Sequence, residues 1–423
     1  MYNAGHPYLL YIFIMYSIVF LIRSKTKNEF LLLFTIFCFL EAKNSWENSI
    51  ISIIKNPINI RVIDIAMLIL IVFMLKSFIE RKFFFNKILK TSKFLYFFIL
   101  LVIIYTMFGV WHFGYAGIAE FRLLFFYIII VIFIFSNVRK YEILRLIKKI
   151  SEYLIPLILL IPINIILTGN ASISSDNRAL GAFIYETITM GYIAGYFYWS
   201  YIDKKFKLFL WFLPIFIVFS IWANVRTVWA IIIAAFLFKF LLEKGKLKAF
   251  FFVIVLIFLI NSMDVININY LENRTKAFTN ISEDATGNWR LYIWNTVIRN
   301  ATFWGEGIGA RFKVYADVIG YAAENGAHNG FIRILYNLGY LGVFITFILF
   351  ISFIIKFLKA MKKKSSLPSY NMIYRLSLMS VFSLILYMMG YSPDLLSWIF
   401  ITFGLVYSLK EKINSNNTRI LHA

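Results

Sequence analysis

Charged residues are scarce in this chain. Only 15% of its 423 residues are charged, whereas 61% are hydrophobic and 20% are aromatic. A water-soluble globule of this size needs abundant polar surface, so lipid must be the main solvent of this protein. Cysteine is almost absent as well. The single Cys38 lies inside an apolar run and excludes both a disulfide framework and a thiolate metal site.

Sequence signatures of nucleotide and metal chemistry are also missing. The chain has no Walker lysine motif and no group of histidines and carboxylates at metal-ligand spacing. Energy from ATP and catalysis by zinc are therefore both unsupported. The glycine-rich segment Gly305–Gly309 follows a predicted helix and leads into no strand–helix unit, which favours a tight turn over a dinucleotide-binding loop.

Hydrophobic runs recur along the whole chain and are separated by short charged segments. A membrane-spanning helix needs ~20 apolar residues, and this spacing predicts an all-α polytopic bundle of about 12 to 13 transmembrane helices instead of a β-barrel. Met1–Ile22 lacks the basic region and cleavage site of a signal peptide and is expected to be the first membrane helix. The clearest other runs are Leu95–Val110, Leu123–Ile134, Leu154–Leu167, Val228–Leu242 and Leu341–Ile355.

The net charge of +22 would suit a protein that binds nucleic acid, but the basic residues form no single basic face. They recur as clusters in every second loop, as the positive-inside rule predicts for cytoplasmic loops. We therefore expect no nucleic acid partner and assign the intervening loops to the periplasmic side. The clusters are Arg23/Lys25/Lys27, Arg81/Lys82/Lys87/Lys90/Lys93, Arg139/Lys140/Arg145/Lys148/Lys149, Lys204/Lys205/Lys207, Lys244/Lys246/Lys248 and Lys362/Lys363/Lys364.

One outer loop is much longer than the others and divides the chain into three parts. Function usually collects in a loop of this length. The parts are residues 1–263, transmembrane helices with short loops; residues 264–332, one large periplasmic loop with short helices; and residues 333–423, C-terminal transmembrane helices and a cytoplasmic tail.

Two arginines lie where a charge must be held near the membrane surface. Arg226 occupies the short turn Asn224–Thr227 between two apolar runs, and its planar, always-ionised group suits a diphosphate or a lipid head group. The alternative is an anchor at the membrane interface. Arg178 is a weaker candidate, because a salt bridge with Asp176 would explain it.

Arg290 lies in the long outer loop. Helical spacing of apolar residues predicts a helix over Trp289–Ala301 that Arg290 would open, so its charge would add to the positive helix terminus and attract anions. Pairing with Glu283 or Asp284 is the alternative.

His328 directly precedes the run that re-enters the membrane after this loop. A positive helix terminus disfavours the imidazolium form, so the ring is expected to be neutral and able to accept a proton. These are the properties of a general base that activates a hydroxyl group. The alternative is a helix-capping or interfacial histidine.

Three motifs stand out in the C-terminal half: Arg226 in Asn224–Thr227; the R-x-x-x-W stretch from Arg290 to Trp294 with the glycine turn Gly305–Gly309; and His328–Asn329 followed, nine residues later, by Gly339–Tyr340–Leu341–Gly342. Together they resemble the bacterial O-antigen ligase/polymerase superfamily of GT-C type membrane glycosyltransferases. The last motif, H-N-x9-G-x-x-G, is the most specific.

The resemblance implies that the substrate is a glycan on undecaprenyl diphosphate. It implies that Arg226 and Arg290 bind the diphosphate and that His328 assists the attacking hydroxyl, these three being the catalytic residues. No metal or cofactor is implied, because the lipid diphosphate is both activated donor and leaving group. Substrate-binding roles are implied for Arg178, Asn329 and Trp294.

Two reactions of the superfamily fit these motifs. A polymerase joins a growing lipid-linked chain to the next repeat unit, and a ligase moves the finished chain onto lipid A-core. We favour the polymerase, because the N-terminal half shows no feature of ligases. A flippase or secondary transporter would need charged or broken-helix sites near the bilayer midplane, whereas the ionisable residues here collect at the interfaces and in one outer loop.

The expected location is the bacterial inner membrane, with the active site on the periplasmic side. Expected partners are the undecaprenyl-diphosphate-linked glycan and membrane lipid, and the resemblance also admits a chain-length regulator protein.

Overall fold

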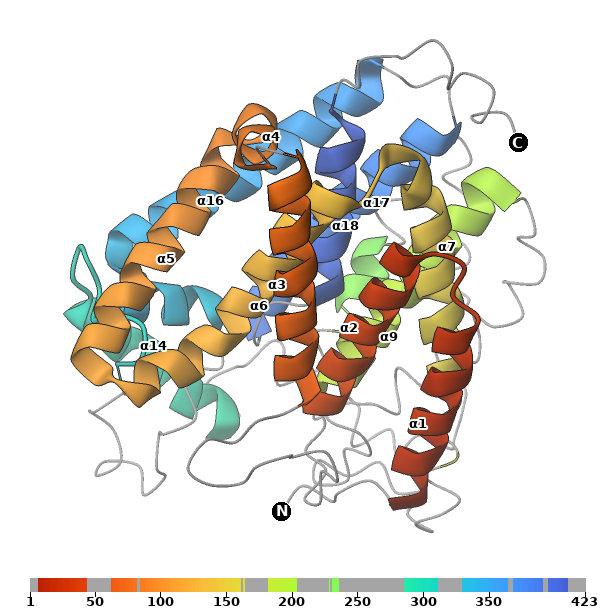
Figure 1. Cartoon of the computed structure of the whole chain (residues 1–423). Coiled ribbons are helices and arrows are strands. Elements are labelled where there is room, and N and C mark those ends of the chain that lie inside the picture. Colours follow the sequence, from red (N-terminus) through yellow and green to blue (C-terminus); the bar gives the residue numbers. More distant parts are fainter. Residues whose placement is uncertain are drawn as a thin grey trace.

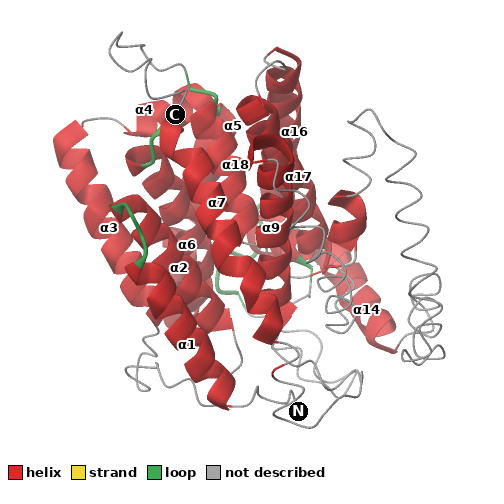
Figure 2. Ribbon diagram, turned by 90° about the vertical axis from the view of Figure 1, so that its right-hand side faces the viewer, coloured by secondary structure: helices red, strands yellow, loops and turns green. Residues whose placement is uncertain are grey.

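The structure is a computed structural model, and all secondary structure in its described part is helical (Figures 1 and 2). This confirms the all-α class. The described residues are 7–43, 62–81, 84–160, 163, 182–203, 228, 230–235, 285–310, 329–363, 368–390 and 395–409.

The N-terminal part contributes eight labelled α-helices and three short helices of other types to the described structure. The α-helices are α1 Pro7–Ile22, α2 Lys27–Lys43, α3 Val62–Arg81, α4 Phe84–Thr91, α5 Lys93–Phe113, α6 Tyr115–Asn137, α7 Ile143–Leu154 and α9 Ala182–Tyr198. The short helices are η1 Lys140–Glu142, η2 Ile155–Leu159 and η3 Trp199–Asp203. In the C-terminal part lie α14 Ala285–Asn300, α16 Gly330–Lys363, α17 Pro368–Gly390 and α18 Leu395–Tyr407.

Several of the described helices can cross a membrane by their length and composition. Four qualify alone, and a pair bent by 110°, Leu124–Asn137 with Lys140–Leu159, would be a fifth if it formed one span. The expected total of about 12 to 13 spans stays a prediction, because it also rests on apolar runs outside the described residues. The four are Val62–Glu80, Lys93–Phe113, Gly330–Lys362 and Pro368–Met389.

The basic cluster from Arg139 to Lys149, expected as a loop, is mostly helical. Its second half lies on α7, which follows α6 after the sharp bend. The face of α7 with Leu146 and Ile150 is buried in the core, and the basic side chains are partly exposed. The length of an apolar run does not reveal this helix, because an amphipathic helix needs only one apolar stripe and its other faces can carry charges.

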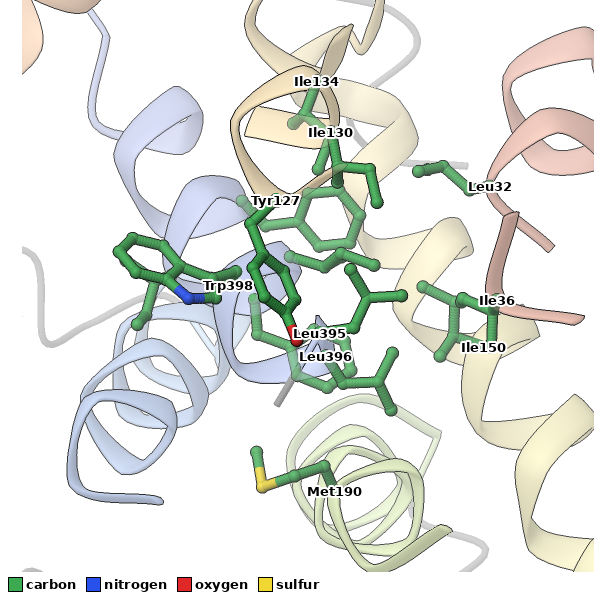
Figure 3. Close-up of a cluster of buried hydrophobic side chains, with 14 of the residues drawn as sticks. Leu32, Ile36, Tyr127, Ile130, Ile134, Ile150, Met190, Leu395, Leu396 and Trp398 are labelled. Carbon is green, nitrogen blue, oxygen red and sulfur yellow. The ribbon is translucent and has the colours of Figure 1, made fainter. Parts of the chain in front are cut away.

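Helix α18 forms the centre of the bundle. All its residues are buried, and it packs against α17, α6 and α9. Figure 3 shows Leu395 and Leu396 of α18 between Tyr127 of α6 and Met190 of α9. A helix that is apolar on every side is stable only where neighbours or lipid surround it completely, which explains its central position.

The two ends of the bundle are formed by different elements. Figure 1 shows α4 and the C-terminal end of α16 at one end, and α14 with the α5–α6 turn at the other. A hydrogen bond from Lys356 Nζ of α16 to the Thr91 carbonyl at the end of α4 ties the first end together. The cluster predicted to be cytoplasmic, which includes Lys87 and Lys90, therefore lies far from the part of the outer loop that the structure describes.

Candidate functional site

Helix α14 packs against the first turns of α16 through a small apolar cluster. Ile293 and Val297 of α14 meet Ile332 and Leu335 of α16, and all four side chains are buried. Trp294 is partly buried and packs on the same cluster. The R-x-x-x-W motif is thereby held beside the helix that follows the H-N pair.

The start of α14 corrects one expectation. The helix begins at Ala285, not at Trp289, so Arg290 is its sixth residue and lies in the second turn. The field of a helix terminus falls off within the first turn, so this field does not add to the charge of Arg290, contrary to the prediction. The guanidinium itself lies outside the described side chains, and its anion-binding role stays a prediction.

Asn329 caps the N-terminus of α16. Its side-chain oxygen accepts hydrogen bonds from the backbone N–H groups of Phe331, at 2.9 Å, and Ile332, at 3.2 Å. Asparagine is among the best residues at this position. The cap of the H-N motif is thus the asparagine, and the imidazole belongs to the residue directly before the cap. The amide nitrogen of Asn329 is the group that a substrate could use.

A break in α16 at Gly339 is the main feature that the sequence did not predict. Gly339 has φ 67° and ψ −168°, which interrupts the helix nine residues after its start. Such a break frees backbone polar groups inside an apolar helix, where each needs a partner. The break falls on the first glycine of the G-x-x-G part of the motif.

The segment after α14 supplies these partners. Before the break, the carbonyls of Tyr336 and Asn337 accept hydrogen bonds from the N–H groups of Glu306, at 2.8 Å, and Gly307, at 3.0 Å. After the break, the N–H groups of Tyr340 and Leu341 donate to the carbonyls of Thr302, at 3.3 Å, and Phe303, at 3.2 Å. The two family motifs are therefore joined by main-chain hydrogen bonds.

The segment Gly305–Gly309 is a tight turn, as predicted, with positive φ at its three glycines. It is wedged against α5 as well as α16. Ile308 is completely buried in the main core, and its carbonyl lies so close to Gly109 of α5 that a Cβ there would overlap it. The outer segment is thus anchored to the N-terminal part of the chain.

A small apolar pocket opens beside this region. It lies between α5, α6, α16, α17 and α18, and residues on both sides of the break, Ile334 and Thr346, line it. Its other walls include Phe98, Tyr127 and Trp398. A lining of this kind suits hydrocarbon better than a charged group.

Several predicted site residues lie outside the described residues. These are Arg178, Arg226 and His328, so their expected convergence stays a prediction. Asn329 and Trp294 are described, and α14–α16 packing brings their helices together. No cluster of residues that could hold a metal ion is found within the described part.

Two ionisable residues near this end of the bundle were not predicted from the sequence to be of interest. Glu186 of α9 is 2% exposed, and its carbonyl accepts a hydrogen bond from Tyr387 of α17 at 2.9 Å. Arg333 lies one turn into α16 and is partly exposed. Each is a single charge inside an apolar run, and that is the signal which could have found them.

The helical bundle and its long apolar helices define a multi-span membrane protein. Residues 208–347 match a family model described as O-antigen ligase. The chain is thus similar to the O-antigen ligase/polymerase superfamily, and the resemblance drawn from its motifs is confirmed. The matched segment includes Arg226, Arg290 and His328 and leaves out Arg178. No curated protein matches the chain.

Proposed function

We propose that this protein is a membrane glycosyltransferase that extends a surface polysaccharide. It would transfer a glycan from undecaprenyl diphosphate onto the next lipid-linked repeat unit at the periplasmic face of the inner membrane. The observation that carries the proposal is the family match over residues 208–347, within which the glycine turn and the break at Gly339 are hydrogen-bonded to each other.

The chemistry divides among three side chains. Arg226 and Arg290 would neutralise the charge that grows on the departing diphosphate, the electrostatic contribution that usually dominates such transfers. His328 would remove the proton of the attacking hydroxyl. The packing of α14 on α16 supports this division, because it holds the helix of Arg290 beside the helix that begins two residues after His328.

The apolar pocket supports a lipid-linked donor. Its lining includes α16 residues on both sides of the break, so a hydrocarbon tail that reached it would contact this helix.

A second reaction, ligation of the finished glycan to lipid A-core, is favoured by the description of the matched family as O-antigen ligase. Purified protein supplied with lipid-linked repeat units alone separates the two reactions. Ladders of longer glycan support the polymerase. A product formed only after lipid A-core is added supports the ligase, and no product under either condition contradicts both.

A further inference from the structure

Two large aromatic side chains are exposed where the segment after α14 meets the break in α16. Phe303 and Trp304 are 55% and 63% exposed, and their rings pack edge to face with centroids 4.9 Å apart. Glu306 follows two residues later and is exposed as well. An exposed apolar patch with a polar rim is typical of an interaction site.

Main-chain hydrogen bonds fix the backbone that carries these three side chains. The carbonyl of Phe303 accepts from the N–H of Leu341 at 3.2 Å, and the N–H of Glu306 donates to the carbonyl of Tyr336 at 2.8 Å. The side chains are therefore presented from a backbone that is already ordered. A ligand that binds them loses little free energy to the ordering of a loop.

This segment lies near the end of a membrane span. The part of α16 from Gly339 to Lys362 is long enough by itself to cross ~30 Å of hydrocarbon at ~1.5 Å per residue. The break at Gly339, and the aromatic pair bonded beside it, then lie at the expected outer surface of the membrane. The first sugars of a lipid-linked glycan lie at the same level, because the hydrocarbon chain ends there.

The combination of side chains favours a sugar ring over a lipid head group. The CH groups on one face of a pyranose ring are weakly positive and pack on the negative face of an aromatic ring. A carboxylate accepts hydrogen bonds from hydroxyl groups at the edge of the sugar. The same carboxylate repels phosphate, and among the described residues none forms an ion pair with Glu306.

We propose that Phe303, Trp304 and Glu306 form a subsite that binds a sugar ring of the lipid-linked repeat unit. The inference rests on the proposed function and assigns a binding surface to the glycan part of its substrate. Trp304 supplies the flat platform, Phe303 holds the indole ring by its edge-to-face contact, and Glu306 accepts hydrogen bonds from the sugar. The three residues bind the glycan and take no part in the bond that forms or breaks.

The test uses the purified full-length protein in proteoliposomes, with Trp304→Leu, Trp304→Phe and Glu306→Ala as variants. Leucine keeps an apolar side chain without a flat ring, whereas phenylalanine keeps a ring. Trp304→Leu and Glu306→Ala should each raise KM for the lipid-linked repeat unit by about 3- to 10-fold with little change in kcat. Trp304→Phe should recover most of the loss.

Trp111→Leu and Arg299→Ala are the matched controls. Trp111 is an exposed tryptophan in the last turn of α5, and Arg299 is an exposed charge in the last turn of α14. Both variants should match the wild type. If leucine serves as well as phenylalanine at position 304, or if Trp111→Leu raises KM equally, Trp304 is an apolar anchor in the membrane surface and the proposal is overturned.

Binding without turnover separates the subsite from the reaction. The probe is the repeat-unit oligosaccharide released from its lipid by mild acid, and calorimetry in detergent measures its affinity. The wild type should bind it about 3- to 10-fold more tightly than Trp304→Leu. Equal affinities contradict the subsite, whereas a wild type that binds the oligosaccharide but forms no product from lipid-linked repeat units contradicts the proposed function alone.

Discussion

The backbones of Gly305 and Gly339 lie in direct contact, although 33 residues of other sequence separate them. A Cβ built on either glycine would overlap the backbone nitrogen of the other. Both residues have positive φ, 74° and 67°. The glycine turn and the helix break therefore fit together only because neither position carries a side chain.

Alanine at either position should disrupt this contact. Gly305→Ala and Gly339→Ala each add the strain of positive φ, about 1–3 kcal/mol, and a steric overlap with backbone that cannot move freely. Both variants should unfold at a lower temperature in detergent and lose activity. The control is Gly114→Ala, since Gly114 also has positive φ but nothing lies within 4 Å of its Cβ position. Equal losses in all three variants would show that the contact between the two glycines contributes nothing.

Asn329 can act as a helix cap, as a substrate ligand or as both. Asn329→Asp keeps a capping oxygen, whereas Asn329→Ala removes it at a cost of about 1 kcal/mol. If the amide nitrogen binds the substrate, the aspartate variant should keep wild-type stability and lose transfer activity, because a carboxylate repels the diphosphate. Full activity of a stable Asn329→Asp variant would restrict this residue to capping.

Substitution of the three predicted catalytic residues should leave the protein folded and abolish its activity. Arg226→Ala, Arg290→Ala and His328→Ala are each expected to abolish long-chain glycan at normal protein levels, because each removes one part of the transfer chemistry. Gel analysis of surface polysaccharide beside an immunoblot measures both quantities, with Arg299→Ala as the reference. Normal chain length in His328→Ala would remove its role as general base.

The far end of the bundle offers a test of stability without an effect on the reaction. The Nε–H and Nη2–H groups of the Arg145 guanidinium both donate to Glu29 Oε2, at 3.0 and 2.8 Å, and the Glu29 side chain is only 1% exposed. Arg145→Ala would leave this carboxylate buried and cost about 2–3 kcal/mol, less than a fully buried pair because the arginine is 41% exposed. Adding Glu29→Gln should restore most of the thermal stability. A double variant no more stable than Arg145→Ala would argue against the buried charge as the cause.

The helical class and several helices could be predicted from the sequence. A long apolar run in a membrane must satisfy its own backbone hydrogen bonds, and a helix does so. Leu95–Val110 and Leu341–Ile355 both lie inside observed helices, α5 and α16. The start of α14 was misplaced by four residues, since its first turn, beginning at Ala285, carries no apolar stripe that marks a helix.

Composition and motif spacing alone determined that lipid surrounds this chain and which superfamily it resembles, because both follow from residue identity and order. Only the tertiary structure decided that the glycine turn closes the break in α16 and that Ile308 anchors this turn against α5. Those contacts are made by main-chain groups, and they require glycines because a side chain would not fit. A sequence pattern records side chains, so it cannot say which distant backbones will meet.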